Sequence, residues 1–104
     1  MISLNEDMPV MPVRSGLSMR KPIHDPSCLK VGEWICEPGT QFEPHSHDID
    51  QVTYIIKGKL RIKEGGVEYL LEPGCYYYNP AGEVIEVLEI IEQTTMLVVS
   101  SVNK

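Results

Sequence analysis

The sequence lacks the features that mark several large classes of protein. No apolar run approaches the roughly 18 residues that a membrane-spanning helix needs. The first ten residues hold no basic segment followed by an apolar one, so no secretory signal is predicted. Lys and Arg number 9 against 15 Asp and Glu, and they form no basic cluster. We therefore expect neither a nucleic-acid partner nor an anionic membrane surface.

Cysteine is also scarce. The three cysteines, Cys28, Cys36 and Cys75, are odd in number and carry no CxxC spacing. We therefore expect neither a disulfide framework nor a zinc knuckle. The low cysteine content favours a reduced, cytoplasmic protein. No base is spaced to activate a cysteine, so a Cys–His nucleophile is not predicted either.

What the chain does have is a regular series of turns and short strands. A length of 104 residues fits a single domain. Turn dipeptides recur at Pro38-Gly39, Lys57-Gly58, Gly65-Gly66, Pro73-Gly74 and Pro80-Ala81. Between them lie runs rich in β-branched and aromatic residues: Leu29–Glu37, Val52–Ile56, Lys59–Lys63, Val67–Glu72, Cys75–Asn79 and Met96–Val102. Short strands at this spacing predict an all-β sandwich or barrel.

Alternation along these strands predicts which side chains face inward. The acids at 33 and 37 leave Trp34 and Cys36 on the opposite, core-facing side. By the same argument the inward-facing residues of the next runs are Leu60, Ile62, Val67, Tyr69 and Leu71. Not all of Tyr76–Tyr78 can face one way, and we assign Tyr78 to the cavity mouth. These four residues, Trp34, Cys36, Tyr69 and Tyr78, are our predicted pocket.

The run Val52–Ile56 is apolar on both faces, so both faces need cover. A second sheet would cover one face, and a partner subunit or the N-terminal arm would cover the other. We therefore expect a homodimer.

The segment Glu83–Gln93 fits two structures. Its acids recur every third residue, which is close to a helical turn and is compatible with an amphipathic helix. On a strand the same acids would alternate in face, unless a bulge resets the register.

One short motif carries chemistry. His45 and His47 stand at positions i and i+2, which share one face of a strand, so two imidazoles can point at a common metal ion. Gln51 can close on the same point after a short turn. Imidazole suits Zn, Fe, Ni and Cu, and Mn is possible when oxygen ligands complete the shell. His24 has no partner at such a spacing, and we assign it to a solvated loop.

The stretch from Gly39 to Gly58 resembles the first motif of the cupin family, which has a His-x-His pair between two glycines. The family's second motif is matched by Gly74, Pro80 and Gly82. The resemblance implies a jelly-roll β-barrel (a double-stranded β-helix) over residues 29–104, preceded by an arm or edge strand over residues 1–28.

Gln51 stands where most of the family has a glutamate. The string HSHDIDQVTY resembles a narrower cupin subset, which includes the pectin-degradation cupin that opens unsaturated uronates and some polyketide-cyclase cupins. In that subset the glutamine is a metal ligand, so the resemblance implies the same role for Gln51.

A second departure concerns the family's last histidine ligand. Ile85 takes its place in an ungapped comparison, which leaves an apolar wall. An insertion of one residue would instead bring Glu86 to the site and keep Glu89 out of the core, since burying an unpaired carboxylate is costly. We favour Glu86 as the fourth ligand or as a general base.

The resemblance implies a divalent metal (Mn, Fe, Ni or Zn) acting as a Lewis acid on a small oxygenated substrate of the sugar-acid or polyketide type, in a lyase, isomerase or cyclase reaction. Two alternatives remain. One is a non-haem iron dioxygenase, in which Glu86 completes a two-His, one-carboxylate set. The other is a non-catalytic cupin that binds or senses a small ligand.

Overall fold

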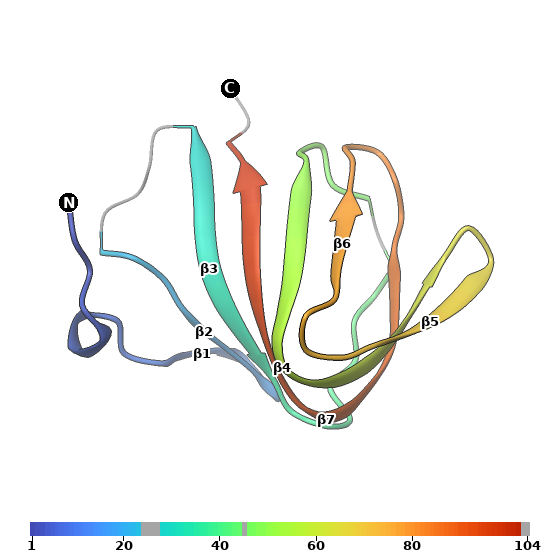
Figure 1. Cartoon of the computed structure of the whole chain (residues 1–104), viewed down its shortest axis with the longest axis horizontal. Helices are drawn as coiled ribbons and strands as arrows, with labels where there is room; N and C mark the ends of the chain where they lie inside the picture. Colours follow the sequence, from blue (N-terminus) through green and yellow to red (C-terminus); the bar gives the residue numbers. More distant parts are fainter. Residues whose placement is uncertain (24–27, 45, 103–104) are drawn as a thin grey trace.

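The structure is all-β, as the spacing of turns predicts (Figure 1). The computed structural model describes residues 1–23, 28–44 and 46–102. Its elements are the 3-10 helix η1 (Asn5–Asp7) and the strands β1 (Met11–Arg14), β2 (Leu17–Arg20), β3 (Leu29–Cys36), β4 (Gln51–Glu64), β5 (Val67–Leu71), β6 (Tyr76–Asn79) and β7 (Glu86–Ser101). Among the described residues, none of the helices is long and apolar enough to cross a membrane.

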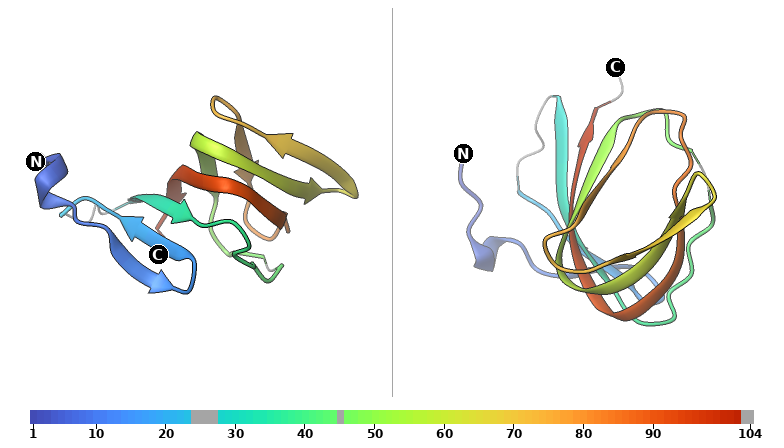
Figure 2. Two further views of the ribbon diagram at one scale, coloured as in Figure 1. Left: turned by 90° about the horizontal axis from the view of Figure 1, so that it is seen from below. Right: turned by 45° about the vertical axis from the view of Figure 1, so that its right-hand side comes forward.

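The strands form one antiparallel sheet in the order β1-β2-β3-β7-β4-β5, with β6 paired to the first part of β4. Two views show this sheet curling round on itself into an open barrel (Figure 2). The two long strands, β4 and β7, run along each other and bend together, so each serves both the front and the back of the barrel (Figure 1). This is the jelly-roll architecture that the sequence predicts.

A bend at Gly58 joins two segments, Val52–Ile56 and Lys59–Lys63, that the sequence predicts as separate strands. They are the two halves of β4, and the pairing with β7 shifts in register on both sides of Gly58. The φ angle of Gly58 is 103°, in the region that favours glycine. A Cβ at this position would overlap the backbone of Gln93 and Thr94, so glycine lets the two strands cross closely.

The ambiguous segment before Gln93 is a strand with a bulge. Ile62 of β4 lies opposite Val87, and the next residue, Arg61, lies opposite Glu89, so β7 carries one extra residue between them. After the bulge Ile90 is 2% exposed, while Glu89 points to solvent and pairs with Arg61 at 3.0 Å. The bulge therefore keeps this acid out of the core.

The core follows the alternation read from the sequence along β3 and β4. Cys36 is fully buried, and Leu60 and Ile62 are 0% and 3% exposed. Tyr69 lies opposite the core residue Ile62 and shares its inward face, as predicted, but Val67 and Tyr69 remain 51% and 48% exposed. They lie on the β5 hairpin, which extends past the body of the barrel (Figure 1).

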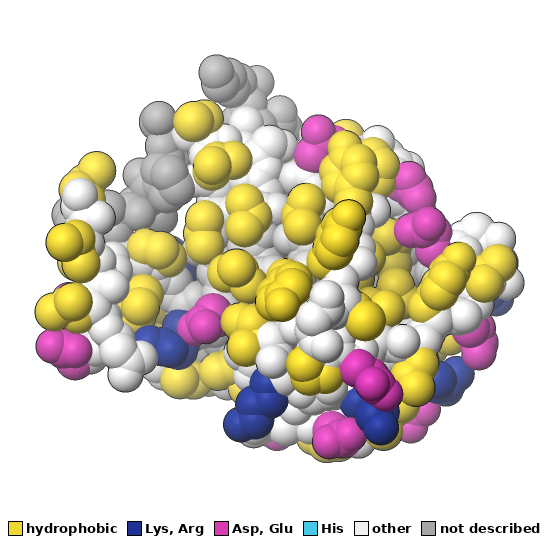
Figure 3. Space-filling model, in the orientation of Figure 1, with side chains coloured by type: hydrophobic (Ala, Val, Ile, Leu, Met, Phe, Trp, Pro, Cys, Tyr) yellow, Lys and Arg dark blue, Asp and Glu magenta, His cyan; other side chains and the backbone are white. Residues whose placement is uncertain are grey.

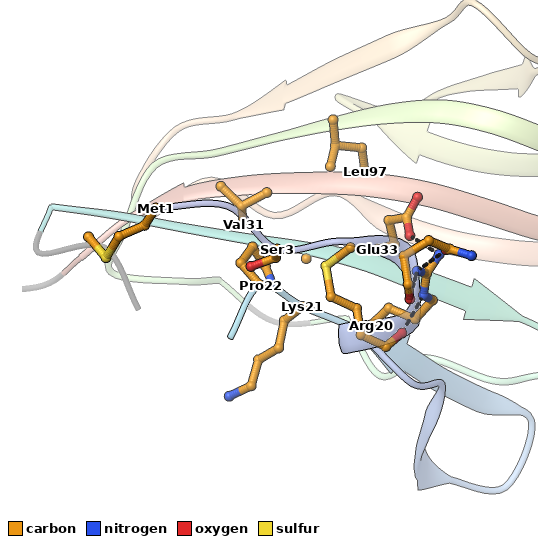
Figure 4. Close-up of a pocket in the computed structure, with 11 residues that line it drawn as sticks. Met1, Ser3, Arg20, Lys21, Pro22, Val31, Glu33 and Leu97 are labelled. Atoms are coloured by element: carbon orange, nitrogen blue, oxygen red, sulfur yellow. Dashed lines mark hydrogen bonds and ion pairs between the residues drawn. The ribbon is translucent and has the colours of Figure 1, made fainter. Parts of the chain in front are cut away.

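The N-terminal segment joins the same sheet through β1 and β2. Arg20 fixes the chain before β1, because its guanidinium donates hydrogen bonds to the backbone oxygens of Met8 (2.7 Å) and Asn5 (3.2 Å) and pairs with Glu33 at 3.1 Å. Figure 4 shows these contacts beside a groove between the arm and the outer face of the sheet, which Val31 and Leu97 line.

Candidate functional site

The barrel encloses an open-ended cavity of about 300 Å³. Its size is at the lower end of small-molecule sites, which span roughly 300–1,000 Å³. The apolar lining residues are Leu17, Trp34, Cys36, Phe42, Ile85, Val87, Met96 and Val98, and the polar ones are Arg14, Glu43, His47, Gln51, Thr53, Tyr77 and Asn79.

Strand pairing gives the cavity a polar side and an apolar side. On β4 and β6, Gln51 lies opposite Asn79 and Thr53 lies opposite Tyr77, and all four side chains share the inner face. On β7, Val98 lies opposite Thr53, and the next inward residue, Met96, lies opposite Ile55 on one side and Trp34 of β3 on the other. A ligand in this cavity therefore meets hydrogen-bonding groups on one side and an apolar surface on the other.

His47 lines the cavity from the segment that leads into β4. Its backbone oxygen accepts a 2.7 Å hydrogen bond from the Gly82 N–H, and the preceding Ser46 bridges to Val84. The two motif segments singled out in the sequence are therefore held against each other at the cavity. His45 lies outside the described residues, so its predicted role as a ligand stays a prediction.

His47 and Gln51 reach the same cavity, as the motif requires. Imidazole nitrogen and amide oxygen are both donors that divalent transition metals accept. In residues 1–23, 28–44 and 46–102, no three His, Cys, Asp or Glu side chains gather into a group that would hold a metal. The described part of the site thus fits two positions of a metal shell, with His45 predicted to supply a third.

The structure has Ile85, not Glu86, in the cavity wall. Ile85 is 8% exposed and lines the cavity with Val87, whereas Glu86 is half-buried opposite Lys63 on the β4–β7 ladder. The register favoured from the sequence is therefore corrected to the ungapped one. The reason is the bulge after Val87. Because it adds one residue, Ile85 can face inward while Glu89 still faces solvent.

The predicted pocket residues divide into two pairs. Trp34 and Cys36 line the cavity. Tyr69 and Tyr78 do not; they are 48% and 49% exposed and border a separate open pocket beside β5, which Ile62 and Leu71 also line. The tyrosine that enters the cavity is Tyr77, the cross-strand partner of Thr53.

Two ionisable side chains in the wall stay neutral. Burial raises the pKa of the Cys36 thiol to about 11, a shift that the positive charge of Arg14 partly opposes. Burial also raises the pKa of Tyr77. Its hydroxyl approaches Thr53, which lowers this pKa slightly, but no hydrogen bond of normal geometry forms, since Thr53 Oγ1 is buried without a partner among the described residues. Near neutral pH Cys36 is thus an inert thiol and Tyr77 a proton donor.

Several lining residues were not predicted from the sequence. Thr53 follows Gln51 by two positions on one strand, so alternation alone places it beside Gln51. Arg14, Phe42 and Glu43 come from β1 and from the loop after β3, and no periodic pattern in the sequence marks them. The Arg14 guanidinium stacks over the Phe42 ring, with 5.0 Å between its central carbon and the ring centroid.

Residues 32–99 match the sequence model of the family described as Cupin domain. No curated protein matches the chain in sequence. This family match covers both motif segments and every strand from β4 to β6.

Three solved structures illustrate the likeness in fold. KdgF from Halomonas sp. has a TM-score of 0.85 and 18% identity, with 97% of this chain and 92% of that chain covered. An RmlC-like cupin from Shewanella frigidimarina has a TM-score of 0.84 and 19% identity, over 98% of this chain and 90% of that chain. The polyketide cyclase RemF from Streptomyces resistomycificus has a TM-score of 0.79 and 20% identity, over 97% of this chain and 78% of that chain. At these identities the likeness establishes the shared fold.

Proposed function

Because this chain belongs to the cupin family, we propose that its cavity binds one divalent metal ion and that the protein is a lyase, isomerase or cyclase acting on a small oxygenated substrate. The observation that carries the proposal is that His47 and Gln51 line one cavity of about 300 Å³. With His45 they make the donor set that the sequence motif predicts. When bound, the metal would supply Lewis-acid chemistry, polarising a carbonyl or hydroxyl oxygen.

The chain's own residues supply the other requirements of such a reaction. Trp34, Ile85 and Val98 give the cavity an apolar wall that excludes water from a bound substrate. The Tyr77 hydroxyl keeps its proton near neutral pH and can donate a hydrogen bond to a substrate oxygen. His47 and Gln51 would hold the metal, so the reacting end of the substrate would lie on the polar side of the cavity.

The dioxygenase alternative depended on Glu86 as the carboxylate of a two-His, one-carboxylate set. Glu86 is not among the residues that line the cavity, so this set lacks its predicted acid. The Lewis-acid reading needs no carboxylate ligand, and we favour it for that reason.

Elemental analysis together with proton exchange tests the proposed function. We expect about one divalent ion per chain after purification. We also expect metal-dependent uptake of deuterium from D₂O at the carbon next to the carbonyls of acetylacetone, a probe of Lewis-acid activation followed by NMR. A chelator should stop the exchange. Metal binding without any exchange on this or related carbonyl probes would favour a non-catalytic binding protein.

Replacing Ile85 by histidine should tighten metal binding. The side chain at this position points into the cavity, so a histidine there would restore the ligand that the family has. Loss of a group that merely supports a ligand costs roughly 10–100-fold in metal affinity, so an added ligand should gain about tenfold or more. Metal titration of the Ile85→His variant measures this gain. Glu86→Gln is the matched control at the next position, and a large loss of affinity in it would contradict the register described above.

We propose further that a second copy of the chain covers the outer face of β3, β7, β4 and β6. Figure 3 shows apolar side chains gathered over these strands. The large exposed members are Val52, Tyr54, Ile56, Tyr76 and Tyr78, with exposed fractions of 39%, 44%, 43%, 67% and 49%. Together they expose on the order of 500 Å², more than half of the ~800 Å² that each partner contributes to a typical interface. An apolar face of this kind is complementary to its own copy.

Light scattering should therefore report about twice the 11.7 kDa of one chain. The double change Tyr54→Lys plus Tyr76→Lys places two charges on facing residues in the middle of the face and should give a monomer. Tyr69→Lys, on the β5 hairpin, is the control that should remain dimeric. A wild-type particle of single-chain mass at micromolar concentration would rule the dimer out.

A further inference from the structure

Arg14 stands at the mouth of the cavity because of a bulge in β1. Pro12 lies opposite Ser18, and Arg14 lies opposite the next residue, Leu17, so Val13 is the extra residue of the bulge. Cross-strand partners share a face, and both Arg14 and Leu17 line the cavity. The bulge thus turns a cation on an exposed edge strand toward the site.

The Arg14 side chain is held in place before any ligand arrives. Its guanidinium lies 5.0 Å from the centroid of the Phe42 ring, within the range of a cation–π contact. Phe42 is half-buried and packs against the core, so the ring is a fixed platform. A guanidinium fixed in this way loses less side-chain freedom when it binds an anion, and its planar fork matches a carboxylate.

The positive charge of Arg14 reaches the interior of the cavity. It lowers the pKa of the Cys36 thiol, against the larger effect of burial. The carboxylates of Glu43, which also lines the mouth, and of Glu37, just beyond β3, lie in the same region. The potential at Cys36 is therefore set in part by Arg14, and a carboxylate bound directly against the guanidinium would gain from the same positive charge.

Apart from Glu43, the proposed metal ligands His47 and Gln51, and the Tyr77 hydroxyl, the cavity offers a ligand few polar groups. The Asn79 amide, oriented by its surroundings, donates to the backbone oxygens of Glu83 (2.8 Å) and Pro80 (3.3 Å). The Thr53 hydroxyl is buried out of reach of solvent. A sugar acid with a hydroxyl on nearly every carbon would leave many of these hydroxyls without partners, and each would lose its bonds to water. An apolar body would instead pack on Trp34, Met96 and Val98.

We propose that the ligand of this cavity is a small organic carboxylate with an apolar or planar body, and that Arg14 binds its carboxylate at the cavity mouth. The inference rests on the proposed function, since it names the substrate class of the same site. It assigns Arg14 a role in specificity that does not require the residue to touch the metal.

Probe binding to the full chain tests the proposal without metal. Benzoate and benzamide have nearly the same shape and differ in charge, and Trp34, the single tryptophan, lines the cavity and reports occupancy through its fluorescence. In chelator-treated protein we expect benzoate to bind roughly tenfold more tightly than benzamide, as one charge-assisted hydrogen-bonded pair predicts. Glucuronate should bind more weakly than benzoate.

The Arg14→Gln variant should lose the preference for benzoate and keep its affinity for benzamide. Arg61→Gln is the control, because Arg61 lies on the outer surface in ion pairs with Glu68 and Glu89. Equal binding of the two probes by the wild type, or a preference that survives in Arg14→Gln, would overturn the role of Arg14. Tighter binding of glucuronate than of benzoate would overturn the apolar body. Because these titrations use metal-free protein, their outcome is separate from failure of the metal site, which elemental analysis reports.

Discussion

Replacing His45 and His47 together by alanine should abolish metal binding and leave the barrel folded. The sequence motif assigns both imidazoles to the ion, and the structure places His47 in the cavity with Gln51. Without both imidazoles, Gln51 would remain as a single weak donor. We expect the barrel to fold without the ion, because Ile55, Leu60 and Ile90 form an almost fully buried apolar core that includes none of the metal ligands. This differs from a zinc finger, where metal binding supplies the folding free energy.

Elemental analysis and thermal unfolding measure the two parts of this prediction. The double variant should hold no metal above background, and its melting temperature in metal-free buffer should lie within about 2 °C of the wild type. His24→Ala is the matched control, because His24, which lies outside the described residues, has no ligand spacing in the sequence. Equal metal in the double variant and the wild type would remove both histidines from the site.

Replacing Gly58 by alanine should produce the largest loss of stability of any single change considered for this chain. Gly58 has a φ angle of 103°, which alanine adopts only with strain. Its Cβ would also overlap the backbone of Gln93 and Thr94, and backbone cannot move aside as the end of a flexible side chain does. Strain and overlap together should cost about 3 kcal/mol or more in the free energy of unfolding.

Chemical denaturation of Gly58→Ala and Gly74→Ala separates strain from overlap. Gly74 has a φ angle of 96°, but a Cβ there would meet open space. Gly74→Ala should therefore lose only about 1 kcal/mol. If the two variants were equally stable, the close crossing of β4 and β7 at Gly58 would contribute nothing beyond its backbone angle.

Local patterns in the sequence predicted most of the barrel. Alternation placed Cys36, Leu60 and Ile62 correctly, because each lies on a strand that pairs on both sides and has one face in the core. The same rule placed Tyr69 on the face of its core partner Ile62, but Tyr69 stays 48% exposed because its hairpin extends past the body of the barrel.

Features that depend on two distant strands could not be read from one sequence. The position of Ile85 depends on a bulge that appears only when β7 is paired with β4. Arg14 lies on a bulge of the β1–β2 hairpin, and it reaches the cavity only because β2 pairs with β3 and so brings the hairpin to the barrel. No periodicity within 11–18 residues carries that information. The candidate site was thus predictable where it rests on a motif, and not where it rests on long-range register.

The sheet does not close fully, so β1 is a free edge strand to which another copy of the chain could add a strand. The edge strand β1 contains Pro12, which has no N–H to donate to an added strand, and the adjacent bulge breaks its ladder. Another chain cannot extend the sheet evenly along this edge, so open-ended growth into fibres is blocked there. In the dimer proposed above, association would instead use the outer face of β3, β7, β4 and β6, where two copies related by a twofold axis would cover each other and leave no equivalent surface for a third.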